Sequence, residues 1–91
     1  MEYFYTAAFE RSLKGFDERQ KQRIQKTLQL AIAFFETSSL PSGLGLKPLQ
    51  KGIWEIRAGL ADRILFRKNK NVIEFLLAGS HDDIKRFLKR T

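Results

Sequence analysis

The side chains of this 91-residue sequence that could take part in chemistry are one histidine, 17 lysines and arginines, and ten carboxylates. His81 is the only one that ordinarily exchanges a proton near neutral pH. These groups are sufficient for RNA cleavage without a metal, in which the 2′-hydroxyl attacks the adjacent phosphate. That reaction needs a base, an acid and fixed positive charge around the transition state. Arginine suits the last role because its planar set of donors matches phosphate oxygens.

Several other chemistries have no support in the sequence. There are no cysteines, which removes a disulfide framework, thiol catalysis and zinc-finger chemistry. The carboxylates and the histidine show no metal-ligand spacing, and there is no phosphate-binding loop or dinucleotide fingerprint. A serine–histidine–acid triad has no nucleophile elbow to support it. We therefore expect neither a metal nor a cofactor.

The charge of the chain is concentrated in one segment. The net charge is +7, and residues 47–70 carry seven basic and two acidic side chains. A local surplus of this kind is typical of a protein that meets phosphates or an acidic partner. The alternative is a solvated basic surface that only keeps the protein soluble.

The N-terminal half predicts a short strand followed by a helical hairpin. The aromatic residues 3–5 suit a strand, and Thr6 can cap a first helix. Asp17 and Gln20 form a capping-box pattern ahead of a long amphipathic helix, about 18–37. The two consecutive helices should lie across the rest of the chain.

The next part predicts a long connection and then a sheet. Residues 37–52 are rich in Ser, Gly and Pro and show no period, so we expect a connection of some 16 residues there. Period-two alternation then predicts three strands. They cover about 54–58, 63–67 and 72–77, joined by turns at 59–61 and at 69–71, where Asn tolerates positive φ.

The C-terminal segment predicts a last helix. Gly79 ends the third of these strands, Ser80 can cap a helix, and Asp82 and Asp83 suit its first turn. The expected fold is therefore one small α+β domain over residues 1–91, in the order β-α-α-β-β-β-α. Its sheet is expected to be antiparallel, with the last three strands as a meander and the helical hairpin packed on one face.

Alternation also predicts which side chains are free to bind. If Trp54, Ile56, Ile64 and Phe66 pack under the helical hairpin, then Arg57, Arg63 and Arg67 project from the other sheet face. Lysines lie at the edges of that face, namely Lys47, Lys51, Lys68 and Lys70. The alternative is that these side chains form only the polar face that any two-layer fold has. Similarly, His81 at a helix start could be catalytic or simply solvated.

The chain resembles the RelE/ParE toxins of type II toxin–antitoxin systems over nearly its full length. The resemblance rests on the aromatic first strand, the paired helices and several segments in characteristic order. These are Lys47-Pro48-Leu49 before Ile53-Trp54-Glu55-Ile56-Arg57, then Asp62-Arg63-Ile64-Leu65-Phe66, and finally Leu77-Ala78-Gly79-Ser80-His81-Asp82-Asp83. The Gly-Ser-His ending is most similar to the YafQ-like branch.

The resemblance implies roles for particular residues. His81 matches the catalytic histidine of YafQ-like toxins, Asp62 the acidic residue that opens the third strand, and Arg63 the phosphate-contacting arginine of RelE. Arg57 stands where RelE-like toxins have a catalytic lysine, and Lys47 where YafQ-like toxins have another histidine. We expect the remaining substrate contacts from Lys51, Arg67 and Lys68. Glu55 departs from the pattern, because RelE-like toxins have a lysine there.

The function that the resemblance implies is cleavage of mRNA on the translating ribosome without a metal, which inhibits translation. Two alternatives stay open: a non-catalytic inhibitor of DNA gyrase of the ParE type, and a degenerate member that only binds nucleic acid. The resemblance also implies a cognate antitoxin as partner. We expect a cytoplasmic protein with no membrane contact, because no basic region followed by an apolar stretch opens the sequence and the longest apolar run is short.

Overall fold

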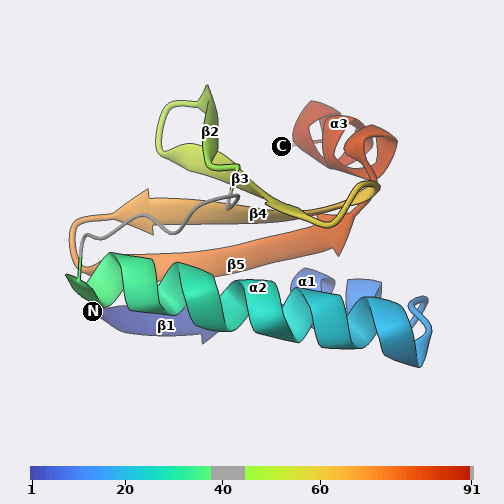
Figure 1. The fold of residues 1–91 in the computed structure, drawn as a ribbon. Helices are drawn as coiled ribbons and strands as arrows, with labels where there is room; N and C mark the ends of the chain where they lie inside the picture. Colours follow the sequence, from blue (N-terminus) through green and yellow to red (C-terminus); the bar gives the residue numbers. More distant parts are fainter. Residues whose placement is uncertain (38–44, 91) are drawn as a thin grey trace.

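The described part of the chain folds into a five-stranded sheet and three helices. The computed structural model describes residues 1–37 and 45–90 (Figure 1). In chain order the elements are β1 (Glu2–Tyr5), α1 (Ala7–Leu13), α2 (Glu18–Thr37), β2 (Lys47–Gln50), β3 (Ile53–Ala58), β4 (Asp62–Asn69), β5 (Val72–Gly79) and α3 (His81–Lys89). None of the helices in the described ranges is long and apolar enough to cross a membrane.

The sheet has the strand order β1-β5-β4-β3-β2. The predicted meander of β3, β4 and β5 is confirmed, and β2 extends it as a further antiparallel neighbour of β3. Strand β1 lies parallel to β5, so the sheet is mixed and mostly antiparallel. A parallel neighbour needs a crossover, which α1, α2 and the strands after them provide. The expected α+β class and the order of the elements are confirmed.

The connection predicted over residues 37–52 is wrong at its C-terminal end. Residues 47–50 form strand β2, with Lys47 opposite Glu55 and Pro48 opposite Trp54. Strand β2 is only four residues long, contains a proline and lies at the sheet edge, so its sequence shows no alternation. Its pairing with β3 makes it a strand. The rest of the predicted connection, residues 38–44, lies outside the described residues.

Helices cover the sheet on both faces. The hairpin of α1 and α2 packs over one cluster of buried side chains, which includes Phe9, Ile24, Ile56, Ile64, Phe66 and Phe75. Helix α3 packs over a second, smaller cluster, in which Ile84 meets Ile53, Leu65 and Leu76. Figure 1 shows α2 and α3 on different sides of the sheet. The face opposite the hairpin is thus partly covered by α3 and partly open.

The cap signals are confirmed at all three helix starts. The Thr6 side chain accepts a hydrogen bond from the Phe9 backbone N–H at 3.1 Å. Asp17 and Gln20 each accept a bond from the other's backbone N–H. The Ser80 side chain accepts from the N–H of Asp83, whose carboxylate accepts from the N–H of Ser80 at 2.9 Å. Such reciprocal bonds satisfy N–H groups that the first helical turn leaves unpaired.

The two predicted turns form, but one uses a different residue. Gly59 takes positive φ of 90° in the turn between β3 and β4, as glycine readily does. In the turn between β4 and β5, Lys70 takes positive φ of 55°, and the prediction that an Asn does so is wrong. Asn69 pairs with Val72 across the sheet, so Asn69 is still part of the strand and Lys70 is the first free turn residue.

Side chains of the first helical segment cap the edge of β5 where β1 ends. Strand β1 pairs only with Val72–Phe75. Beyond it, the Thr6 hydroxyl donates to the carbonyl oxygens of Phe75 and Leu76, at 3.1 and 3.3 Å. The Ser12 hydroxyl accepts from the Ala78 N–H at 3.1 Å. These bonds occupy backbone groups that would otherwise need a neighbouring strand.

The capping box of α3 predicts how stability depends on pH. The backbone N–H of Ser80 holds the pKa of Asp83 below its ordinary value of 3.8, with further help from the Ser80 hydroxyl and Arg86. Because the pKa is lower in the folded chain, the carboxylate stabilises the fold fully above the unfolded value. This contribution is lost as pH falls through the folded value. Wild type should therefore lose stability relative to Asp83→Asn as pH falls below about 4, as measured by urea unfolding.

Asp82→Asn is the matched control, because Asp82 is exposed and carries the same charge one position earlier. The difference in free energy of unfolding between Asp82→Asn and the wild type should change less over the same pH range. Identical acid-side curves for the two variants would contradict the role of the capping box.

Candidate catalytic face of the sheet

Two arginines meet on the sheet face opposite the helical hairpin. Arg57 on β3 is directly opposite Arg63 on β4, and Arg63 is in turn opposite Gly79 on β5. On the other side of Arg57 lies Gly45, where an added Cβ would come within 3.0 Å of the Arg57 Cβ. The row therefore has two guanidinium groups in the middle and a glycine at each end.

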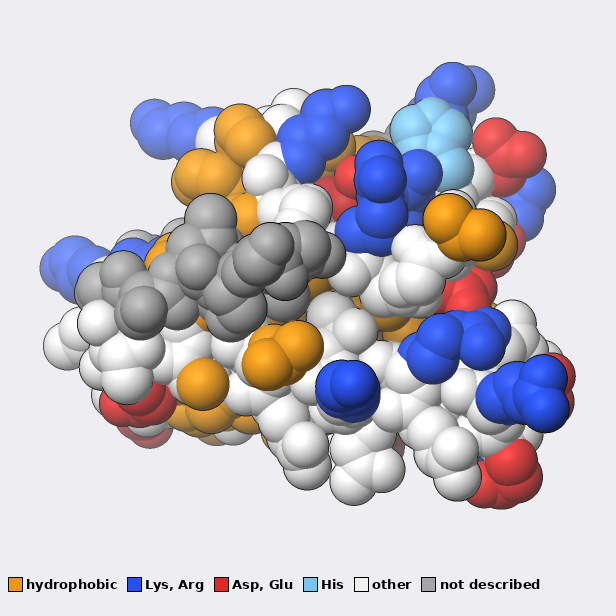
Figure 2. Space-filling view, viewed as in Figure 1, with side chains coloured by type: hydrophobic (Ala, Val, Ile, Leu, Met, Phe, Trp, Pro, Cys, Tyr) orange, Lys and Arg blue, Asp and Glu red, His pale blue; other side chains and the backbone are white. Residues whose placement is uncertain are grey.

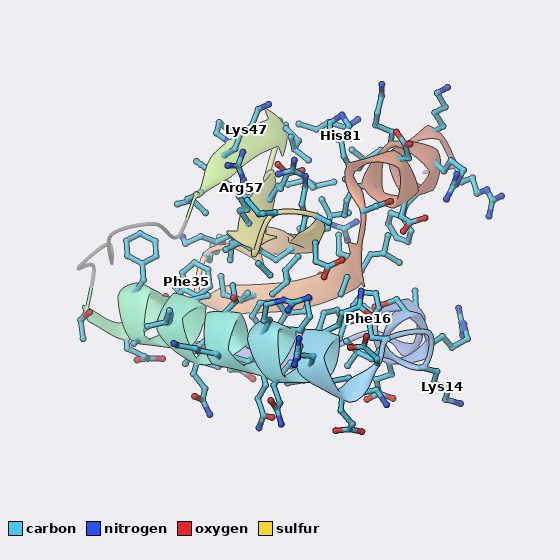
Figure 3. All side chains as sticks on the ribbon, turned by 45° about the vertical axis from the view of Figure 1, so that its right-hand side comes forward. Lys14, Phe16, Phe35, Lys47, Arg57 and His81 are labelled. Atoms are coloured by element: carbon cyan, nitrogen blue, oxygen red, sulfur yellow. The ribbon has the colours of Figure 1, made fainter. Side chains whose placement is uncertain are left out.

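His81 lies at the Gly79 end of this row. It follows the N-cap Ser80 as the first residue of α3, and its side chain is exposed. In Figure 3, Lys47, Arg57 and His81 lie on one side of the sheet, and α2, which carries Phe35, lies on the other side. In the space-filling view the histidine has lysine and arginine side chains beside it (Figure 2). The structure thus brings His81 to the same face as Lys47, Arg57 and Arg63, groups distant from it in the sequence.

Tight packing at the start of α3 fixes where His81 sits. An added Cβ at Gly79 would lie 2.8 Å from Oδ2 of Asp83, so only glycine fits between the strand and the helix. Asp83 also holds Ser80 through the capping box and forms an ion pair with Arg86. The position of the imidazole is consequently set by the strand end and the cap together.

Glu55 is a charged residue of this face to which we assigned no role from the sequence. It is only 4% exposed, lies opposite Lys47 on β2, and forms an ion pair with Nη1 of Arg63 at 3.5 Å. The signal that could have found it is the alternation of β3, because Glu55 and Arg57 are two residues apart and share a face.

The structure places Asp62 on the opposite face. Asp62 is opposite Ala58, which packs in the cluster beneath the helical hairpin. Its carboxylate is buried and lies 3.9 Å from Nη2 of Arg23 on α2. The structure therefore does not bring Asp62 together with Arg57 and Arg63; it ties the beginning of β4 to α2.

Three of the expected substrate-binding residues lie at the other end of the strands. Arg67 shares the face of Arg63 but lies four positions further along β4, roughly 13 Å away, and its Nη1 is 3.6 Å from Oε1 of Glu74. Lys51 is exposed in the turn between β2 and β3. Lys68 points the other way and donates through Nζ to the carbonyl of Lys70 at 3.3 Å. These three residues form a separate group from Arg57, Arg63 and His81.

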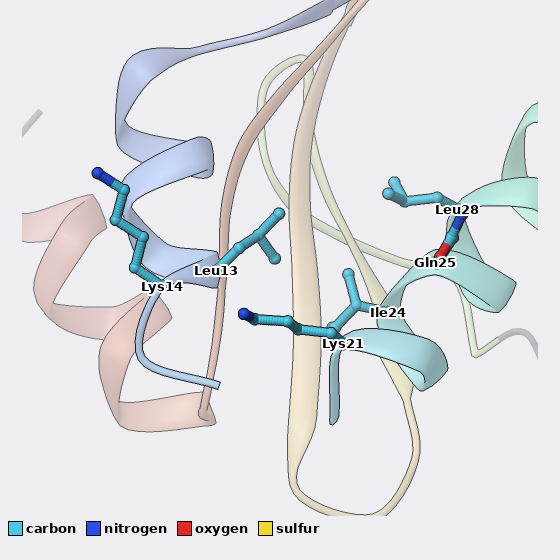
Figure 4. Close-up of a pocket in the computed structure, with 6 residues that line it drawn as sticks. All are labelled: Leu13, Lys14, Lys21, Ile24, Gln25 and Leu28. Carbon is cyan, nitrogen blue, oxygen red and sulfur yellow. The ribbon is translucent and has the colours of Figure 1, made fainter. Parts of the chain in front are cut away.

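A cavity between α1 and α2 lies away from these groups. It has a volume of about 390 Å³ and is lined by Leu13, Lys14, Lys21, Ile24, Gln25 and Leu28 (Figure 4). Its walls are mostly apolar, and it lies on the hairpin side of the sheet. Within residues 1–37 and 45–90, no three His, Cys, Asp or Glu side chains come together as metal ligands would. The open face therefore carries the more plausible chemistry, with an imidazole for proton transfer and two guanidinium groups for phosphate charge.

Comparisons with known proteins give structural matches only. No family model matches the sequence, and no curated protein matches it. A chain of the E. coli DinJ–YafQ complex has a TM-score of 0.77 and 19% identity, covering 91% of this chain and 96% of that chain. A chain of the RelB–RelE antitoxin–toxin complex from Methanococcus jannaschii has a TM-score of 0.69 and 20% identity, covering 92% and 96%.

A third match is the YoeB/ParE toxin from Agrobacterium tumefaciens, with a TM-score of 0.65 and 17% identity over 89% of this chain and 99% of that chain. Each match spans nearly the whole of both molecules, although no more than 20% of the residues are identical. This chain therefore has the fold of the RelE/ParE toxins, as its sequence resemblance indicated, and a YafQ complex is among its structural neighbours.

Proposed function

We propose that this protein is the toxin of a type II toxin–antitoxin system and cleaves mRNA on the translating ribosome as a metal-independent endoribonuclease. The observation that carries the proposal is the single imidazole at the start of α3, on the same open face as the opposed Arg57 and Arg63. The fold supports it, because the structural neighbours include toxins of this kind.

In the proposed reaction the scissile phosphate lies over the row formed by Arg57 and Arg63. The two guanidinium groups balance the charge that grows on the phosphate oxygens in the transition state. His81 transfers a proton at one end, either from the attacking 2′-hydroxyl or to the leaving 5′-oxygen. Lys47, next to Glu55 on the same face, is placed to bind an adjoining phosphate.

Most of the remaining expected residues take supporting roles in this proposal. Lys51 and Arg67 would contact phosphates further along the RNA, since they lie at the other end of the strands. Lys68 points to the opposite face, so we assign it no substrate contact. Asp62 would act through the fold, because its ion pair with Arg23 fixes the beginning of β4, where Arg63 follows.

A cognate antitoxin is the proposed partner. Two of the structural neighbours were solved as complexes, DinJ with YafQ and RelB with RelE. The net charge of +7, concentrated in residues 47–70, makes an acidic partner segment a physically reasonable match for the open face.

Replacing the imidazole should remove cleavage without harming the fold. His81→Ala should lower the cleavage rate by about 10²-fold or more, which is the usual contribution of a general acid or base. The stability should hardly change, because His81 is exposed and alanine favours a helix. In vitro translation with a chelator present, followed by mapping of RNA 5′ ends, measures this. Lys85→Ala, an exposed change on the same helix, is the control.

Several outcomes of that experiment would contradict the proposal. Cleavage by His81→Ala at the wild-type rate would exclude the assigned role of the imidazole. Intact mRNA together with stalled DNA supercoiling would instead indicate a gyrase inhibitor. RNA binding with no cleavage and no growth arrest would indicate a degenerate member of the fold.

The two arginines at different ends of the face should behave differently. Arg57→Gln should lower kcat by about 10²-fold, because a charge close to the reacting phosphate is lost. Arg67→Gln should leave kcat nearly unchanged. It should make RNA binding less dependent on salt, by the amount expected for the loss of about one phosphate contact. Single-turnover cleavage and binding titrations at several salt concentrations separate the two effects. Equal losses of kcat would mean that the reaction is not centred on Arg57 and Arg63.

Antitoxin binding should weaken as salt rises, because it depends on the basic surplus of residues 47–70. We expect the antitoxin to be encoded beside the toxin gene. Titrating that gene product against this protein at increasing salt measures the effect. An affinity that does not change with salt would rule out a mainly electrostatic contact.

A further inference from the structure

Glu55 carries a buried carboxylate on the open face that the proposed mechanism does not use. Three of its neighbours on that face are cationic, whereas the apolar Leu65 lies directly opposite it on β4. Lys47 is directly opposite on β2, Arg57 is two residues along β3, and Arg63 is its ion-pair partner on β4. A single carboxylate therefore lies among three positive charges.

The arginines need this negative charge. Arg57 and Arg63 are directly opposite each other in the sheet, and like charges in such a pair destabilise it. Arg63 is also largely enclosed, with only 18% of its side chain exposed, so water cannot do much to offset its charge. A buried charge without a counter-charge is strongly unfavourable. Glu55 supplies that counter-charge from within the sheet.

The contact with Glu55 also restricts how Arg63 can turn. Oε2 of Glu55 accepts from Nη1 of Arg63 at 3.5 Å, which fixes one corner of the planar guanidinium. Nε of Arg63 is buried and has no hydrogen-bond partner among the described residues. Because the donors of a guanidinium lie in one rigid plane, holding one corner sets the direction of the others.

We propose that Glu55 is a positioning residue, which orients Arg63 toward the scissile phosphate and balances the charge of the three cations around it. This inference rests on the proposed function, in which Arg63 contacts that phosphate. Glu55 acts through Arg63 and does not touch the substrate, because its own side chain is only 6% exposed. It is the buried carboxylate of this face, whereas Glu74 is more exposed and pairs with Arg67, and Asp62 belongs to the opposite face.

A double-mutant cycle tests whether Glu55 acts through Arg63. Glu55→Gln should lower kcat between about tenfold and about 100-fold, the cost of a misplaced group, without raising KM. In an Arg63→Gln background the same change should have no further effect on kcat. Glu74→Gln is the matched control, because it removes the carboxylate of the Arg67 ion pair on the same sheet, where we expect no change in kcat.

A second measurement reads the orientation of Arg63 without any cleavage. In the wild type the Nε–H group of Arg63 is buried, so its NMR signal should be protected from hydrogen exchange with solvent. Glu55→Gln should remove that protection, and Glu74→Gln should preserve it. If the wild type cleaves no RNA but the signal behaves in this way, the proposed function fails and the positioning of Arg63 stands.

The inference is overturned if Glu55→Gln keeps both the wild-type kcat and the protected Arg63 signal, or if its loss of kcat is the same in the Arg63→Gln background. Should Glu55→Gln not fold, the double variant removes both buried charges. Folding of the double variant would then support the pairing, and its failure to fold would count against it.

Discussion

Alternation along β3 and β4 is the constraint on which the arrangement of this protein depends. Every second side chain is sealed under the hairpin of α1 and α2, including Ile56, Ile64 and Phe66. The intervening side chains must then lie on the other face, whatever their charge. This places Arg57 opposite Arg63 and buries Glu55 between cations. A one-residue shift of either strand would move the arginines into the apolar cluster, so the core protects the register of the open face.

Helix α3 links that face to the histidine. Its apolar side, with Ile84, covers only part of the sheet, around Ile53, Leu65 and Leu76, and its first residue is separated from the end of β5 by Ser80 alone. The lack of a side chain at Gly79 lets the cap of α3 approach the strand closely. A structure that buries α3 more fully would cover the arginines, and one that releases it would lose the position of His81.

Local signals in the sequence predicted much of this fold. The bounds expected for the long helix, 18–37, agree with Glu18–Thr37. They were predictable because the capping box and the helical spacing of apolar residues both lie within that one segment. Strand β2 could not be predicted in this way, since only its pairing with β3 makes it a strand. Asp62 and Ile64 are two residues apart on β4, so alternation predicts that both lie on the hairpin face. The family resemblance instead suggested a catalytic role for Asp62, which would require the opposite face. The buried ion pair of Glu55 depends on how β3 and β4 align, and no local pattern gives that alignment.

The hydroxyl contacts of Thr6 and Ser12 have a consequence for the behaviour of the protein in a crowded solution. An unpaired sheet edge is a template for the addition of a strand from another molecule, and aggregation can start there. On β5 the two hydroxyls occupy backbone groups beyond the end of β1, while the opposite edge strand carries Pro48 and a bulge next to it. The part of β5 beyond β1 and the β2 edge of the sheet thus both discourage the addition of a strand from another molecule.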